Sequence, residues 1–508
     1  MRHAVLFSTV VCGVAVTAPV LAALGAAPAR PAPDRAAAPV HDTAPAGDAA
    51  RLSAARTVEY RGLRIPVPAG WEVHDLERDP ARCVRYDRRA LYLGRPGPQP
   101  DCPARIVGRT EAVHVQPAGP RQAGAPEPSA SRTIVPGEKL AALEVPETVD
   151  HEMRLELPEA GVTITGVYGT DPAPLQRMLR GARLTGERPA ELRTPEPSAR
   201  REAPDPPAAG PSTASPSTAS PSMASPSATS SSSASTPATG PSAETPPSPS
   251  PSAASPSAAG PSAAAPSAAS PDGAGAAAGE RDKRWVKGKG FDTCTAPSLA
   301  AMKAWRPSFK VTNIYIGGAA RGCAQPNLTE RWVREVRGMG YRITPTYVGL
   351  QAPCGPRPQK FTAKNAAKQG RKAAVDAARR AKALGIPKGA PIYFDMEAYG
   401  GKRKCRNAVL RFVDNWVRKL KDEGYTPCLY SSVKSGIRDV GRAAGISKPE
   451  GIWFAHWNGK ADVYGDPFIP DGWWRPHRRI KQYRGDHNET HGGVTLNIDS
   501  NIADGLAY

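Results

Sequence analysis

Residues 391–399 read PIYFDMEAY, so an apolar run ends in two carboxylates with one residue between them. The run has the composition of a buried β-strand, and burying a charge there is costly. Residues two apart in a strand point to the same side, which places Asp395 and Glu397 on one face and Phe394 and Met396 on the other. Two nearby carboxyl groups cannot both ionise easily, so one of them can hold a proton and donate it. Cleavage of a glycosidic bond needs this division of labour.

The same pair of acids also has a purely structural interpretation. In it, Asp395 caps the loop that follows the strand, and Glu397 pairs with one of the nearby cations Lys402, Arg403 or Lys404. The residues around the pair leave both interpretations open, so the choice depends on what the other elements bring to the same place.

From about residue 285 onward, apolar runs of strand length alternate with helical patterns. Strands are expected to end at Asp292, Ile316, Tyr347, Asp395, Ser431, Ala455, Gln482 and Asp499. Helices are expected over residues 297–305, 328–339, 361–384, 406–423 and 433–444, with none between the last three strands. The pattern predicts an α/β fold, a (β/α) TIM-type barrel of about five β/α units plus three strands.

A closed barrel brings further acids to the predicted site. The first and last strands of such a barrel are neighbours, so Asp292 and Asp499 are expected to face the same mouth as Asp395 and Glu397. Flat aromatic faces suit sugar rings, although any single ring is explained at least as well by the core. Aromatic residues collect at the predicted strand ends: Tyr315, Tyr347, Tyr393, Tyr430, Trp453, Trp457 and Tyr483.

These motifs resemble known families. The segments GFD (290–292), YFDME (393–397), WFAHW (453–457), QY (482–483) and NID (497–499) follow the order seen in glycoside hydrolase family 25 lysozymes, which cleave peptidoglycan. GFDTCTAPS, IYIGG, PTYVG, IYFDMEAY and LYSS are more similar to the glycoside-hydrolase-like domain family of unknown function 1906, found in exported actinobacterial proteins. The resemblance covers about residues 289–508.

The resemblance implies roles for individual residues. Glu397 matches the general acid, and Asp395 matches the carboxylate that orients the substrate's acetamido group in a substrate-assisted, retaining reaction. Asp292 and Asp499 match supporting acids, and Gln482 is expected to contact substrate with the aromatic residues. His456 lies where the lysozymes usually have a smaller or different residue, so the pocket is expected to differ. No metal or cofactor is expected.

The beginning of the chain has the layout of a secretory signal peptide, expected over residues 1–29. A short basic start precedes an apolar run and small residues, and an uncleaved membrane anchor is the alternative. We therefore expect a secreted, extracellular or wall-associated protein with no transmembrane anchor after cleavage. Residues 55–190 predict a small, mainly β domain without a recognisable catalytic cluster, and residues 195–282, rich in Pro, Ala, Ser and Thr, predict a disordered linker before a barrel over 285–508.

Export makes the cysteines disulfide candidates. Cys83 and Cys102 can pair only with each other if the domains are not cross-linked, and Cys428 lies inside a predicted strand over residues 425–432. The preferred remaining pairs are Cys294 with Cys323 and Cys354 with Cys405, because each cysteine then lies in a loop just after a strand. The spacing does not fit a zinc site, so metal binding and thiol catalysis are disfavoured.

Positive charge is concentrated in the C-terminal part. The chain carries a formal net charge of +20, and residues 281–508 alone hold about 41 Lys and Arg against about 19 Asp and Glu. Such an excess attracts polyanions, which outside a bacterial cell are teichoic acids, anionic peptidoglycan and phospholipid head groups rather than nucleic acid. A charged surface that only keeps the domain soluble is the alternative. Three functions follow in order: a cell-wall glycoside hydrolase acting on peptidoglycan or a related amino-sugar polymer, a non-catalytic carbohydrate-binding barrel, and a basic adaptor on the wall or membrane surface.

Overall fold

The computed structural model describes residues 56–119, 127–185 and 284–508. The expected signal peptide over residues 1–29 and linker over 195–282 lie outside these residues. The described residues all belong to one compact unit. Among the described residues, no helix is both long and apolar enough to cross a membrane.

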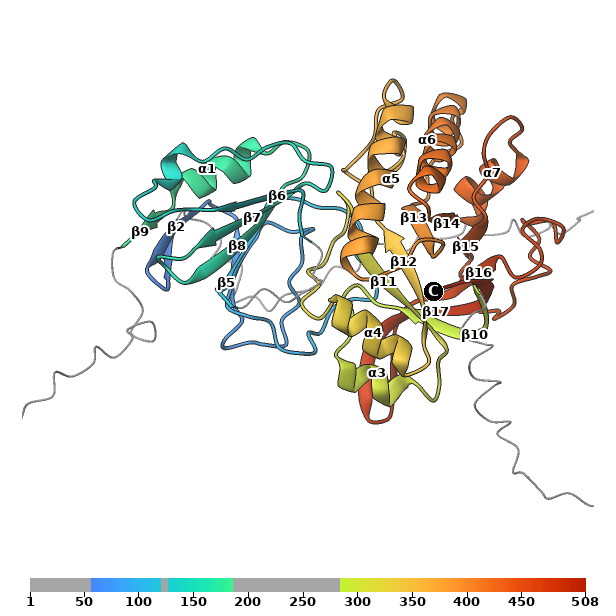
Figure 1. The fold of residues 1–508 in the computed structure, drawn as a ribbon, viewed down its shortest axis with the longest axis horizontal. Helices are drawn as coiled ribbons and strands as arrows, with labels where there is room; N and C mark the ends of the chain where they lie inside the picture. Colours follow the sequence, from blue (N-terminus) through green and yellow to red (C-terminus); the bar gives the residue numbers. More distant parts are fainter. Residues whose placement is uncertain (1–55, 120–126, 186–283) are drawn as a thin grey trace, which may run out of the picture. The chain divides into compact units, whose positions relative to one another are not determined.

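Residues 56–185, called the β region below, are mainly β, as predicted. A six-stranded sheet has the order β3-β4-β5-β8-β7-β6, and a smaller sheet has the order β1-β2-β9. Helix α1 (Ala173–Gly181) buries Leu175, Met178 and Leu179 against the apolar core (Figure 1). The strands are β1 (Arg56–Tyr60), β2 (Leu63–Val67), β3 (Glu72–Asp75), β4 (Ala90–Leu93), β5 (Ala112–Pro117), β6 (Ala130–Thr133), β7 (Glu152–Leu157), β8 (Val162–Val167) and β9 (Arg183–Leu184).

The C-terminal part is a closed eight-stranded barrel in which β10 to β17 follow one another in chain order, which confirms the predicted fold class. Strands β10 to β16 pair in parallel, whereas β17 is antiparallel to both β16 and β10. The strands are β10 (Trp285–Asp292), β11 (Val311–Gly317), β12 (Arg342–Tyr347), β13 (Pro391–Met396), β14 (Thr426–Ser432), β15 (Gly451–Ala455), β16 (Arg479–His491) and β17 (Val494–Leu506).

Helices connect the first six barrel strands and cover the outside of the barrel (Figure 1). They are α3 (Leu299–Trp305), α4 (Glu330–Gly338), α5 (Ala366–Ala383), α6 (Arg403–Asp422) and a final segment in which a π-helical turn, Val433–Ile437, runs into α7 (Arg438–Arg442). Side chains cap two of them: Ser298 accepts from the Ala301 amide, and Thr329 accepts from the Trp332 amide. The last three strands are joined without helices, as predicted.

Alternation along β13 divides its side chains between two cores. Phe394 and Met396 pack with the helices in the outer core, whereas Tyr393 packs inside the barrel with Cys428 and Trp453. Asp395 shares the inner face, so the period of two read from the sequence is the one that the strand adopts.

Two predicted strand ends are wrong. Gln482 was expected to end its strand, but β16 continues to His491. Asp499 was expected to end the last strand, but it lies near the middle of β17, opposite Asp292 in the pairing register. Because β17 runs antiparallel to its neighbours, it descends from its pairing with the far end of β16, passes the mouth at Asp499 and reaches the base, where Leu506 pairs with Trp285. Asp499 reaches the predicted mouth all the same.

Three disulfides join the pairs expected from the sequence: Cys83–Cys102, Cys294–Cys323 and Cys354–Cys405. Cys428 is free and buried inside the barrel. The first two disulfides are neighbours in one buried cluster, although one belongs to the β region and the other to the barrel.

Candidate active site at the barrel mouth

The end of β13 holds the acidic pair Asp395 and Glu397. Asp395 is fully buried, and Glu397, one residue beyond the strand, is 7% exposed. Gln351, from the loop after β12, fixes this corner because its Nε2 donates to the Asp395 carbonyl at 2.7 Å and its Oε1 accepts from the Glu397 amide at 2.7 Å. Among the described residues, Asp395 Oδ1 has no hydrogen-bond partner. A buried, unpaired carboxylate oxygen at a barrel mouth is suited to accept a hydrogen bond from a ligand.

Asp292 and Asp499 form a second pair of acids on neighbouring strands. Gln482 joins them, since its Nε2 lies 3.1 Å from each carboxylate oxygen of Asp292 and 3.0 Å from Asp499 Oδ2. Asn501 also donates to Asp292, at 2.5 Å. The Oε1 atom of Gln482 accepts from Tyr430 and from the Trp457 indole, each at 2.9 Å. Gln482 therefore links the acids to the aromatic part of the mouth.

Burial controls the ionisation of these acids. It raises the pKa of Asp292 well above its ordinary value, and repulsion from Asp499 adds to the shift. Burial also raises the pKa of Asp499 to about 6, and it raises the pKa of Asp395 although Arg105 and Arg357 oppose the shift. The mouth therefore contains carboxyl groups that keep protons at a pH where ordinary carboxyl groups have lost them.

Two arginines contact Glu397, and neither is one of the nearby cations that the structural interpretation predicted as its partner. Arg357, from the loop after β12, donates to Oε2 at 2.8 Å, and Arg105 of the β region forms an ion pair with Oε1. The predicted partners Lys402, Arg403 and Lys404 lie instead at the start of α6, where all three are exposed. Two guanidinium groups stabilise the charged form of Glu397.

The predicted aromatic residues separate into two groups. Tyr315 donates to Asp292 at 3.3 Å, Tyr430 contacts Gln482, and Trp457 is 58% exposed beside Gln482, so these three line the mouth. His456 lies near it but is engaged by Asp466 at 2.6 Å. Tyr483 is half-buried at an irregular point of β16.

The other aromatic residues lie away from the mouth. Tyr347 points into the outer core and donates to Asp376 of α5 at 2.8 Å, so the expectation that it contacts substrate is not supported by its position. Tyr393 lies toward the base, where its hydroxyl donates to the Leu506 carbonyl at 2.8 Å. Trp453 is buried in the barrel interior, with its indole on Asn501. These residues are core, because a strand end alone does not say which face a side chain takes.

Sequence reasoning missed several residues of the mouth: Arg105, Gln351, Arg357 and Asn501. Asn501 lies two residues after Asp499 on the same strand, so the period of two could have identified it. Gln351 and Arg357 lie in a loop with no periodic pattern, and Arg105 comes from another region of the chain. No local signal identifies those three.

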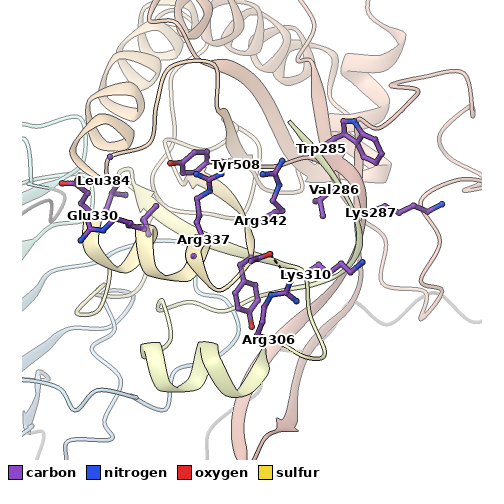
Figure 2. A pocket seen from close by; sticks show the side chains of 16 residues that line it. Trp285, Val286, Lys287, Arg306, Lys310, Glu330, Arg337, Arg342, Leu384 and Tyr508 are labelled. Atoms are coloured by element: carbon purple, nitrogen blue, oxygen red, sulfur yellow. Dashed lines mark hydrogen bonds between the residues drawn. The ribbon is translucent and has the colours of Figure 1, made fainter. Parts of the chain in front are cut away.

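A basic pocket lies at the opposite end of the barrel, where the parallel strands begin. It has a volume of about 1030 Å³, and six cations, Lys287, Arg306, Lys310, Arg334, Arg337 and Arg342, line it with one acid, Glu330. Figure 2 shows Arg337 beside Tyr508, whose ring centre is 3.8 Å from the guanidinium carbon. Arg306 is structural, because it donates to the backbone carbonyls of Phe309, Met339 and Gly340.

The chain was compared with known proteins. Solved structures similar to the chain include the Tat-secreted protein Rv2525c of Mycobacterium tuberculosis (17% identity, 42% of this chain and 93% of that chain, TM-score 0.31). They also include a muramidase from Acremonium alcalophilum (14% identity, 43% and 93%, TM-score 0.28) and the autolysin LytC from Streptococcus pneumoniae with a synthetic peptidoglycan ligand (10% identity, 42% and 46%, TM-score 0.29). No curated protein matches the sequence. Residues 303–503 match the Rv2525c-like, glycoside hydrolase-like domain family, which confirms the resemblance seen in the sequence.

Proposed function

We propose that the protein is an exported glycoside hydrolase that cleaves a bond in peptidoglycan or a related amino-sugar polymer. The observation that carries the proposal is the meeting of Asp395 and Glu397 with the Asp292 and Asp499 pair in one barrel mouth. Barrel enzymes hold their active sites at this end, and the family match adds a glycoside hydrolase-like domain.

The proposed chemistry uses the two acids of β13 in different ways. Glu397, once protonated and free of its arginines, gives its proton to the glycosidic oxygen as the bond to the anomeric carbon breaks. The acetamido oxygen of the substrate attacks that carbon, and Asp395 accepts from the acetamido N–H through its unpaired oxygen. Water then opens the ring intermediate with retention of configuration, while Glu397 takes the proton back. Tyr315, Tyr430 and Trp457 provide flat or polar contacts for the sugar.

The test is the release of reducing ends from purified peptidoglycan by the full chain and by Glu397→Gln. We expect activity to fall by at least about a hundredfold in the variant, because the general acid is lost. Glu423→Gln, at the C-terminal end of α6, is the matched control, because Glu423 is half-buried and pairs with Lys419 of the same helix, and it keeps full activity. Sugar binding without release from any chain would favour the non-catalytic carbohydrate-binding barrel instead.

The basic pocket at the barrel base favours a second activity of the same protein, retention on anionic wall polymers. Besides the structural Arg306, five cations line this pocket at the end of the barrel opposite the acidic mouth (Figure 2). They provide a phosphate-binding surface that leaves the mouth available to glycan. In this proposal, binding to the wall through basic residues assists catalysis. The basic adaptor is then not an alternative to the hydrolase.

Binding to a poly(glycerol phosphate) chain tests the proposed retention. Lys310 and Arg334 are exposed at the pocket, so Lys310→Glu with Arg334→Glu is expected to weaken binding at least tenfold at low salt and to flatten its salt dependence. Lys368→Glu with Lys372→Glu makes the same change of charge on the exposed face of α5. Equal loss in both double variants would show that total charge, not the pocket, is responsible.

A further inference from the structure

A segment of the β region lies across the barrel mouth. Residues 98–109, called the covering segment below, are fixed to the loops around the mouth by backbone hydrogen bonds: Gly108 donates to the Ala320 carbonyl at 2.8 Å, and Val107 forms an antiparallel bridge with Arg321. Arg109 and the Gln359 side chain bind each other through two hydrogen bonds of 2.7 Å each.

The earlier residues of the covering segment are also hydrogen-bonded to the barrel. The Ala104 amide donates to Asn497 Oδ1 on β17, and Asn327 donates to the Pro98 carbonyl at 2.9 Å. The covering segment therefore contacts the barrel along its whole length, on loops that follow several different strands.

Arg105 projects from this segment into the mouth. Besides its ion pair with Glu397 Oε1, its guanidinium donates to the Tyr430 hydroxyl and to Gln482 Oε1, the latter at 3.3 Å. The guanidinium carbon lies 4.6 Å from the centre of the Tyr430 ring. The Arg105 side chain is only 12% exposed. Arg105 thus occupies the space between Glu397, the Tyr430 ring and the side-chain amide of Gln482.

We propose that the barrel mouth has a partner within its own chain: the covering segment closes the site, and Arg105 occupies the place of a sugar until the segment is displaced. This inference rests on the proposed function only for the identity of the ligand, a sugar, that Arg105 excludes. A glycan cannot reach Glu397 past Arg105, and an ion-paired carboxylate has no proton to give to a leaving oxygen.

The close packing behind Arg105 indicates a built interface rather than a chance contact. A Cβ atom on Gly322, in the loop after β11, would lie 2.4 Å from Ile106 Cγ2 and 2.6 Å from the Ile106 carbonyl oxygen, so only glycine permits this approach. Next to it, sulfur atoms of Cys83, Cys102 and Cys323 lie within 4.8 Å of one another in the buried disulfide cluster. The Cys83–Cys102 disulfide anchors the covering segment three residues before Arg105.

An alternative role for Arg105, binding of substrate, predicts a different effect of its removal. If Arg105 bound an anionic group of the substrate, its removal would reduce activity. The structure favours closure because both oxygens of Glu397 are already taken, one by Arg105 and one by Arg357. Closure predicts that removing Arg105 increases activity.

Two variants of the full chain open the mouth by independent routes. Arg105→Ala removes the inserted side chain, and Gly322→Val forces Ile106 away without changing any group in the mouth. Arg78→Ala is the control for the first, because the Arg78 side chain is 89% exposed and its ion pair is with Asp75 at the surface. Gly472→Val is the control for the second, because Gly472 is exposed and nothing lies within 4 Å of its added Cβ.

Hydrogen exchange and reducing-end release from peptidoglycan are measured on the same chains. The amides of Ala104, Gly108 and Arg109 donate to barrel acceptors, so they report attachment of the segment directly. We expect both opening variants to exchange these amides at least about tenfold faster and to release reducing ends at least about tenfold faster than the wild type, with both controls unchanged.

The two readouts separate failure of the closure from failure of the hydrolase. Unchanged exchange in both opening variants, or faster exchange with reduced release in Arg105→Ala, would overturn the closure. Faster exchange with no release from any chain would uphold the closure and overturn the proposed hydrolase.

Discussion

The side-chain amide of Gln482 donates to both carboxylate oxygens of Asp292, each at 3.1 Å. Gln482 lies on β16 and Asp292 on β10, and β17 lies between these two strands in the barrel. The same nitrogen reaches Asp499, so a single neutral group holds two buried acids. Its oxygen accepts from Tyr430 and Trp457, which fixes the amide orientation. Gln482 is therefore a positioning residue on which the geometry of the mouth depends.

Gln482→Met keeps the approximate volume and removes every one of these hydrogen bonds. We expect reducing-end release to fall about a hundredfold, in the range seen when one preorganised donor is lost. The pH profile of release is also expected to move upward, because the amide no longer offsets the burial that raises the pKa of Asp292. Gln369→Met on α5 is the control, and an unchanged rate and profile in Gln482→Met would contradict this role.

Asp499 makes stability depend on pH. Its folded pKa of about 6 exceeds the ordinary 3.8, so the folded state holds the proton more tightly and the free energy of unfolding falls as pH rises from about 4 to about 6. Asp499→Asn removes this loss. Relative to wild type, the variant should gain up to about 3 kcal/mol across that window and no more above it, measured by urea unfolding.

The control for that measurement is Asp422→Asn at the exposed end of α6. Its stability difference from wild type should not vary with pH. A difference for Asp499→Asn that is equally flat would show that Asp499 ionises normally in the folded protein.

A buried ion network joins α5 to the β region. Arg380, whose side chain is 1% exposed, donates to Asp376 at 3.0 Å and forms an ion pair with Asp150. Arg380→Met leaves these acids buried with fewer partners, so we expect the free energy of unfolding to fall by about 3–5 kcal/mol. Arg371→Met on the exposed face of the same helix is the control. A loss below about 1 kcal/mol would mean that the network contributes little to stability.

The Cys354–Cys405 disulfide links the loop after β12 to α6, with 51 residues of separation. Closing a loop of this length lowers the entropy of the unfolded chain, so replacing both cysteines with alanine should reduce the free energy of unfolding by about 4 kcal/mol at most. Peptide mapping of the oxidised wild type provides the parallel check. A bridge to Cys428 in that map would contradict the pairing, because Cys428 lies inside the barrel.

The sequence predicts the barrel because its signals are local. The alternation of PIYFDM fixes which side of β13 faces inward, and helical patterns separate the first six strands. Tyr347 shows where this reasoning fails, since its strand end is correct but its side chain faces the helices. Arg105 shows the larger failure: its ion pair with Glu397 joins the β region to the barrel across a long stretch of sequence, and no pattern near either residue records it.

The most direct test of the account is reducing-end release from peptidoglycan by the Gly322→Val chain, with and without Glu397→Gln. Opening the mouth removes the block by the covering segment, so the first chain should release reducing ends faster than the wild type, and Glu397→Gln should abolish that gain. Equal release from the two chains would contradict the assignment of Glu397 as the general acid.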